Sequence, residues 1–137
     1  MDLDKARDYV RTHHRAVLTT MRADGTPQMS PVTVAVDADG FVVVSSRETA
    51  VKVKNLRRDP RAWACVIPDG FFGEPFVQVE GDVTLVALPE AMEGLVDYYR
   101  SISGEHPDWD DYRAAMVRDQ RVLIKLALTR AGPDIAG

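Results

Sequence analysis

The first dozen residues carry an apolar pattern of helical spacing. Leu3, Ala6 and Val10 recur three or four positions apart, so they share one side of a helix. Asp2 or Asp4 is placed to cap the first turn of that helix. We therefore expect the chain to begin with an amphipathic helix that turns its apolar side to a core.

An alternating pattern follows this helix. Three runs of apolar and β-branched residues, separated by Asp-Gly turns, predict three consecutive strands at 16–22, 28–37 and 41–46. Pro31 lies inside the second run, where a missing N–H group is tolerated only at a sheet edge, a bulge or an interruption of the ladder. We mark Pro31 as a candidate site position for this reason.

The pattern returns to helical spacing after the third strand. Ala50, Val53 and Leu56 recur at intervals of three, and Thr49 is placed to cap the first turn. Pro60 follows the expected end of this helix at residue 57 or 58. A short helix is therefore expected to begin directly after a strand.

The second half of the chain completes the set of elements. It predicts strands at 61–67, 76–88 and 121–131, with a bend in the middle one at Gly81, and helices opening at Pro89 and over 108–119. Six strands with peripheral helices, and β runs that follow one another, predict a mainly β protein built on a closed antiparallel barrel.

Composition limits the function classes. The 137 residues, 45% of them hydrophobic, suffice for one domain over 1–137. A net charge of −4 provides no general positive field for nucleic acid, and no apolar run approaches membrane-spanning length. We expect a cytoplasmic protein without nucleic-acid or membrane partners. The single cysteine, Cys65, lies in the apolar run AWACVI and is expected to be a small buried thiol.

One segment runs against the overall charge. RETAVKVKNLRRDPRA, residues 47–62, holds six basic residues and two acidic ones, a composition that most often marks a solvated helix face. A helix that starts at a strand end also presents free N–H groups and a positive dipole end, which favours an anion. Lys52 and Asn55 lie three positions apart and share a side of this helix. Arg57, Arg58 and Arg61 fit a solvated face.

Several segments of the chain together resemble a known protein family. The order of an Asp-Gly turn, a strand with MSPV, a strand ending in VSS and the segment TAVKVKNLRRDPRA is similar to the flavin and deazaflavin oxidoreductases of the split β-barrel fold, the superfamily named after pyridoxamine 5′-phosphate oxidase. The later segment DYYRSISGEHPDWDDYRAAMVRDQRVLI resembles its small actinobacterial branch that uses the deazaflavin coenzyme F420. The resemblance covers nearly the whole chain.

The resemblance implies a homodimer with two cofactor sites in grooves at the interface, each built by both chains. It places one group of residues beside the tricyclic ring, namely Met29, Ser30, Pro31 and Val32. It places another group at the phosphate and ribityl part of the cofactor, namely Ser45, Ser46, Thr49, Ala50, Lys52 and Asn55.

The chain departs from the family at one position. Many relatives carry serine or arginine two residues before the lysine that corresponds to Lys52, whereas this chain has Ala50. One direct phosphate contact is therefore absent, and backbone N–H groups or Arg47 must replace it. Three aromatic residues, Phe71, Phe72 and Trp109, either approach the site from the partner chain or serve as packed aromatics.

The resemblance implies an F420-dependent oxidoreductase that transfers a hydride between the deazaflavin C5 and a small organic substrate. The cofactor then carries the chemistry, so no catalytic side chain is expected. This agrees with a sequence in which we find no Ser-His-Asp arrangement and no metal-ligand spacing. Two alternatives stay open: an FMN-binding oxidase-like enzyme, and a non-catalytic carrier or sensor of a flavin, deazaflavin or haem-like ligand.

Overall fold

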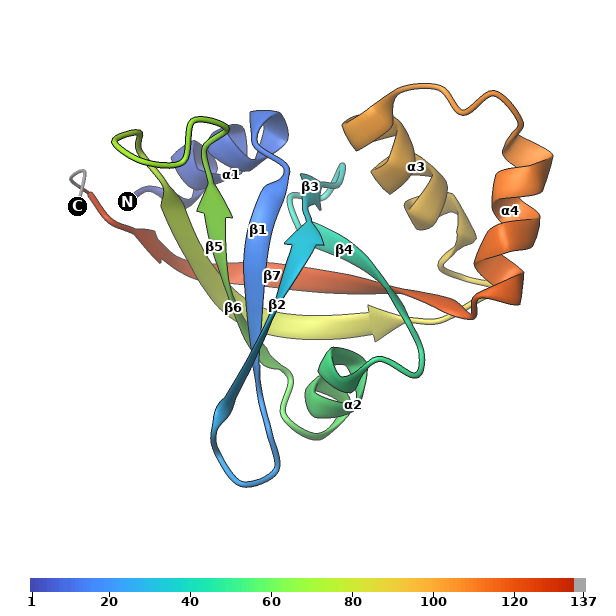
Figure 1. The fold of residues 1–137 in the computed structure, drawn as a ribbon, viewed down its shortest axis with the longest axis horizontal. Coiled ribbons are helices and arrows are strands. Elements are labelled where there is room, and N and C mark those ends of the chain that lie inside the picture. Colours follow the sequence, from blue (N-terminus) through green and yellow to red (C-terminus); the bar gives the residue numbers. More distant parts are fainter. Residues whose placement is uncertain (135–137) are drawn as a thin grey trace.

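The computed structural model describes residues 1–134, which form seven strands and four helices (Figure 1). Their order along the chain is α1 (Leu3–Thr12), β1 (Arg15–Met21), β2 (Pro27–Thr33), β3 (Ala35–Val36), β4 (Val42–Arg47), α2 (Val51–Arg58), β5 (Arg61–Ile67), β6 (Val77–Val86), α3 (Met92–Ser103), α4 (Trp109–Arg118) and β7 (Arg121–Gly132).

The strands form one curled antiparallel sheet. Its order is β2-β1-β5-β6-β7-β4-β3, so β2 and β3 stand at opposite ends. Only Val34 separates these two strands in the chain, and the sheet must therefore curl until its edges come together. The result is a barrel that is split between β2 on one side and β3 with β4 on the other (Figure 1). This is the fold class that the sequence predicts.

The number of strands differs from the prediction. The expected second strand is two strands, because β2 pairs with β1 and β3 pairs with β4. The chain changes partner at Val34, whose N–H donates to the His14 carbonyl at 2.8 Å. Val32, Val34 and Val36 keep the same alternation across this point, so the apolar pattern runs on without a break. The sheet has seven strands instead of six.

The barrel interior holds the main core. Inward-facing side chains alternate along each strand, as with Ala16 and Leu18 on β1 and Val122, Ile124 and Leu126 on β7. Helix α1 packs against β3 and β7 and adds its own buried side to this core, as its spacing predicts.

A second, smaller core joins the helical pair α3–α4 to the outer side of the sheet. Val43 and Leu123 belong to this core, whereas their neighbours along β4 and β7 belong to the barrel core. Helices α3 and α4 lie outside the barrel (Figure 1). The buried members of this core are Ala35, Val43, Ala91, Leu95, Val96, Tyr112 and Leu123. The α3–α4 pair is therefore fixed to the strands that border the split.

Two helix starts agree with the sequence. The Asp2 side chain accepts hydrogen bonds from the first turn of α1, and the Asp108 side chain accepts one from Asp111 N at 3.1 Å in α4. Helix α3 begins at Met92, three residues after the expected start at Pro89, because residues 88–91 form a turn before it. None of the helices within residues 1–134 is both long enough and apolar enough to cross a membrane.

The start of α2 corrects a prediction. Ala50 is the N-cap residue, and the expected cap, Thr49, makes no capping bond. The turn after β4 explains this difference, because Ala50 N donates to Arg47 O at 3.0 Å and moves the helix start one residue further along. The first turn of α2 therefore has no side-chain cap, which leaves its N–H groups open.

Proline and glycine in the strands lie as expected. Pro31 is in β2, an edge strand that pairs only with β1. A β-bulge between Glu80 and Gly81 bends β6 where it pairs with β7.

Candidate functional site

A groove lies in the split of the barrel. Strand β3 pairs only with Val42 and Val43 of β4. The rest of β4 therefore pairs with β7 on one side and faces the split, without a strand partner, on the other. The groove has a volume of about 290 Å³. It is lined by Pro31, Val32, Thr33, Ser45, Ser46, Arg47, Ala50, Lys52, Tyr98 and Arg121. Strands β2 and β4, the start of α2 and helix α3 therefore all contribute.

Three of the lining side chains are cations. Arg47 and Arg121 lie directly opposite each other on β4 and β7, a pairing of like charges that destabilises a sheet unless something neutralises it. Burial lowers the pKa of Lys52, and the charge of Arg121 lowers it further. Within residues 1–134 none of the three forms an ion pair. The groove is therefore a concentrated positive site.

The start of α2 adds backbone donors to this charge. Ala50 has no side-chain cap bond, and the first turn of the helix contains no acidic residue. The N–H groups of Val51 and Lys52 have no acceptor within the helix, because each would need a residue before its start. A helix start in this state favours an anion by both its free donors and its dipole.

Three of the other four cations of the basic segment are paired or bonded within the fold, and the fourth, Lys54, is exposed. Arg57 is paired with Glu48, and Arg61 is paired with Asp59 at 2.8 Å. Arg58 is exposed, as expected, and also donates to the carbonyl of Met21 at 2.5 Å. Of the six basic residues in 47–62, only Arg47 and Lys52 line the groove.

Asn55 lies in the fold and outside the groove lining. Its side chain is only 5% exposed, and its Nδ2 donates to Thr20 Oγ1 at 3.1 Å. Its Oδ1 accepts from Arg58 at 3.2 Å. Thr20 in turn donates to Gln28 Oε1 at 3.3 Å, so the network ties α2 to β1 and β2. This network holds α2, and with it Lys52, at the border of the split.

The sequence-predicted site residues fall into two groups. The groove brings together Pro31, Val32, Ser45, Ser46, Arg47, Ala50 and Lys52. Outside its lining lie Met29, Ser30, Thr49 and Asn55. Met29 is 64% exposed on β2, and the Ser30 hydroxyl is buried without a hydrogen-bond partner among the described residues.

Three lining residues were absent from the sequence prediction. Thr33 ends β2, Tyr98 comes from α3, and Arg121 begins β7. The Tyr98 hydroxyl donates to Thr33 O at 2.9 Å and also contacts Thr33 Oγ1, so α3 is tied to the end of β2. Only the strand register and the docking of α3 bring these residues together, and no local motif marks them.

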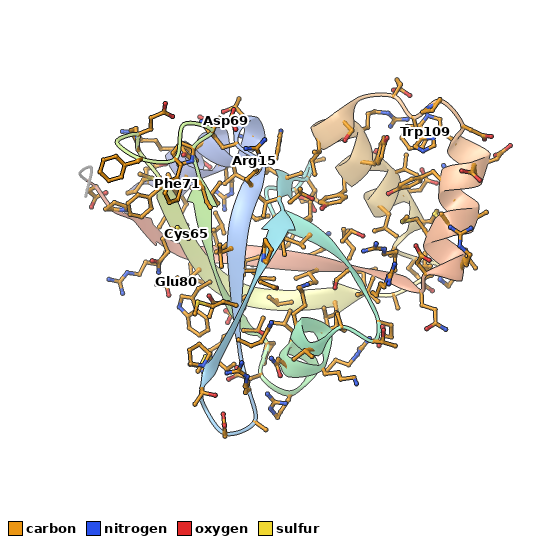
Figure 2. All side chains as sticks on the ribbon, in the orientation of Figure 1. Arg15, Cys65, Asp69, Phe71, Glu80 and Trp109 are labelled. Carbon is orange, nitrogen blue, oxygen red and sulfur yellow. The ribbon has the colours of Figure 1, made fainter. Side chains whose placement is uncertain are left out.

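The aromatic residues that the sequence singled out lie away from the groove lining. Trp109 packs between α3 and α4, near Tyr99 and Tyr112, with the Arg100 guanidinium 5.0 Å from its ring centroid. Phe71 and Phe72 are exposed on the loop between β5 and β6. Phe71 lies on the opposite side of the molecule from Trp109 (Figure 2). Trp109 is thus a packed aromatic residue of the helical pair.

A larger hollow of about 850 Å³ lies elsewhere, between the N-terminus, β6 and the end of β7. Its charged groups are already paired, because the N-terminal amine binds Asp134 and Arg130 lies 3.5 Å from Glu80. The smaller groove is the better candidate site, since its cations are unpaired and the buried Nε of Arg121 in its lining has no hydrogen-bond partner among the described residues.

Comparison with known proteins defines the class of this protein. The model of a family described as pyridoxamine 5′-phosphate oxidase matches residues 3–132. The chain belongs to this family, which includes oxidoreductases, and its fold is the split β-barrel.

Solved structures agree with this assignment. The chain is similar to the conserved hypothetical protein Rv2991 from Mycobacterium tuberculosis, with a TM-score of 0.78 and 25% identity over 96% of this chain and 82% of that one. It is also similar to an F420 reductase, with a TM-score of 0.70 and 21% identity over 92% and 94% of the two chains. A heme binding protein from Mycobacterium smegmatis shows 19% identity and a TM-score of 0.69, over 94% of this chain and 52% of that one.

Proposed function

We propose that this protein is an F420-dependent oxidoreductase that binds the deazaflavin cofactor in the groove of the split barrel. The observation that carries the proposal is the set of unpaired cations, Arg47, Lys52 and Arg121, beside the uncapped start of α2. The structural likeness to an F420 reductase supports this choice of cofactor.

The groove residues fit a phosphate-bearing cofactor. Lys52 and the N–H groups at the start of α2 would hold the phosphate, and Ser45 and Ser46 would face the ribityl chain. Val34 N donates to His14 O directly before β1, and residues of an antiparallel strand alternate, so the backbone groups of Pro31 and Thr33 face the split. That edge of β2, with Val32, would lie along the flat ring.

When bound, reduced F420 supplies a hydride from C5 to an electrophilic carbon of the substrate, so the deazaflavin loses two electrons, the substrate gains them, and solvent provides the balancing proton. The residues of this chain bind and orient the cofactor. Lys52 and the start of α2 would hold the phosphate end, and Tyr98 with Thr33 borders the other wall of the groove. The substrate is proposed to be a small organic molecule.

A fluorescence titration tests the proposal. The protein is titrated with F420 and, under the same conditions, with FMN. We expect micromolar or tighter binding of F420 and much weaker binding of FMN. Lys52→Met should weaken F420 binding by about tenfold or more, since it removes a charge-assisted contact. Lys54→Met is the matched control, because Lys54 is exposed on the same helix, and it should change affinity by less than about twofold.

The same measurements separate the alternatives. Preference for FMN would make this an FMN oxidoreductase that uses the same groove. The heme binding structural neighbour makes a carrier or sensor the second candidate, tested by titration with hemin. Tight F420 binding without oxidation of the reduced cofactor by a panel of enones and tetrapyrroles would favour a carrier.

We also propose a homodimer with the groove at its interface. The outward residues of β1, β2 and β5 form a largely apolar area, because Val17 lies opposite both Pro31 and Cys65, and in the next outward row Thr19 lies between Met29 and Trp63. Pro31 belongs to this area and to the groove. A second chain that covers this area would therefore also approach the cofactor.

A further inference from the structure

Gln120 has a strained backbone conformation beside the groove. It lies between α4 and β7 with φ of 52°, in the left-handed region that side chains other than those of glycine and asparagine rarely adopt. Within residues 1–134 only one other non-glycine residue, Phe71, has a positive φ. Strain of this kind persists only where surrounding contacts enforce it, and it is concentrated at functional sites.

The contacts of Gln120 connect two elements of the groove. Its N–H donates to Val117 O at 3.1 Å and ends α4. Its carbonyl accepts from Glu48 N at 2.9 Å, so it holds the turn between β4 and α2. Arg47 precedes this turn, and the uncapped start of α2 follows it. Gln120 therefore connects the end of α4 to the turn that leads into α2, where the groove has its free N–H donors.

Arg121 follows Gln120 directly and lines the groove. Its Nε is buried and has no hydrogen-bond partner among the described residues. A buried donor of a charged group is costly to leave unsatisfied, and a guanidinium donates readily to phosphate oxygens. Arg47 lies opposite Arg121 in the sheet, and no carboxylate of residues 1–134 lies within ion-pair distance of either.

We propose that Arg121 is an anion-binding residue of this groove, which donates from Nε to a phosphate oxygen, and that left-handed Gln120 is the residue that positions it. This inference rests on the proposed function, because it assigns the phosphate of the cofactor as the ligand. The strained turn aims the guanidinium of Arg121 and holds the start of α2, so both sets of donors face one anion.

NMR of the arginine side chains tests Arg121 without any cofactor. The ¹⁵N-labelled protein is titrated with inorganic phosphate, and the Arg121 Nε–H signal is assigned by its loss in Arg121→Lys. We expect this signal to move and saturate, while the Nε–H signal of Arg118, exposed on α4, stays in place. An Arg121 signal that does not move, or that moves only together with Arg118, would overturn the proposal.

Paired ligands separate this inference from the proposed function. FMN and riboflavin differ by the phosphate alone, and F420 differs from its deazaflavin chromophore by the tail that begins with the phosphate. Arg121→Met should lower affinity for the phosphorylated member of a pair by about tenfold and leave the other within about twofold. An equal loss for both members would contradict a phosphate contact. If the wild type binds neither pair but the NMR shift occurs, the cofactor proposal fails and the anion site stands.

Two substitutions at Gln120 test the positioning role. Gln120→Ala keeps a Cβ and therefore the strained turn, so phosphate affinity should stay within about twofold of wild type. Gln120→Val disfavours the left-handed turn because its side chain is β-branched, so the unfolding midpoint should fall and the phosphate affinity of the folded variant should fall by about fivefold. A folded valine variant that keeps full phosphate affinity would show that Gln120 does not position Arg121.

Discussion

At the scale of single residues, Lys52 is held in an unfavourable place for a charge. Burial, followed by the charge of Arg121, lowers its pKa below the ordinary 10.5, so the unliganded fold favours the neutral amine more than water does. The protonated lysine therefore destabilises the free protein, and this cost is relieved as pH rises through the lowered pKa. A bound phosphate reverses the balance, because it stabilises the charged form.

This balance predicts a pH dependence of cofactor binding. F420 affinity should be level while Lys52 is protonated and should fall as pH rises through its lowered pKa, before 10.5 is reached. Lys52→Arg keeps its charge at these pH values and should bind with a level affinity throughout. Fluorescence titrations at several pH values measure this difference. The same fall in both proteins would mean that another group controls binding.

Asn55 is expected to act on stability. Asn55→Ala removes the buried bonds to Thr20 and Arg58, which should lower the free energy of unfolding by about 2 kcal/mol. F420 affinity of the folded variant should stay within about twofold of wild type, since Asn55 does not line the groove. Urea unfolding and fluorescence titration provide the two values. A large loss of affinity with unchanged stability would place Asn55 in contact with the cofactor.

Some residues of the groove can be predicted from the sequence and others cannot. Lys52 and Ser46 lie within contiguous segments whose strand-to-helix order already indicates an anion site. Arg121 and Tyr98 come from elements far along the chain, and only the pairing of β4 with β7 and the docking of α3 bring them to the groove. Asn55 shares a helix with Lys52, but the depth of the helix against β1 turns its side chain to an internal partner.

At the scale of elements, the bend of β6 depends on close backbone packing. A Cβ placed on Gly81 would lie 1.8 Å from the carbonyl oxygen of Ala127, and backbone cannot move aside as a side chain can. Gly81→Ala should therefore lower the free energy of unfolding by about 3 kcal/mol, at the upper end for overpacking. Gly132→Ala is the control, since open space surrounds that Cβ. Equal stability of the two variants in urea would contradict this account of the bulge.

The helical pair depends on a buried phenol. The Tyr112 hydroxyl donates to Leu95 O at 2.8 Å, and burial raises its pKa to about 12. Because the folded pKa lies above the unfolded 10.0, this contribution is complete below pH 10.0 and is lost as pH rises toward 12.

Tyr112→Phe removes both the bond and the titration. It should cost about 1 kcal/mol of unfolding free energy at neutral pH. The advantage of the wild type over this variant should disappear between pH 10.0 and about 12. Urea unfolding of both proteins across this range measures the difference. An advantage that stays constant would show that the phenol does not titrate with unfolding.

The same scale shows where element prediction from sequence stops. The apolar periods place the helices and most strands within a few residues, because each buries one side in the barrel or the second core. The break between β2 and β3 escapes this method, since Val32, Val34 and Val36 share one side before and after the change of partner. The N-cap of α2 at Ala50 depends on a single turn bond after β4.

At the scale of the whole molecule, the outer face of the sheet beside the split carries both an exposed apolar area and part of the groove lining. Met29 is 64% exposed on β2, and Pro31, two residues further, lines the groove. An apolar area that continues into a charged groove is expected to be covered by a partner that also completes the site. This argument concerns two chains, so no pattern within one sequence displays it.

Met29→Glu tests this dimer. The side chain is exposed in a single chain, so the variant should fold, but its charge should be buried without a partner in the proposed interface and should produce monomers. Because the variant no longer dimerises, its F420 affinity should fall as well. Val117→Glu is the matched control, because Val117 is also an exposed apolar residue, 60% exposed, but lies on α4 away from β1, β2 and β5. Sedimentation velocity and fluorescence titration measure both effects, and a monomer with full F420 affinity would contradict a site built by two chains.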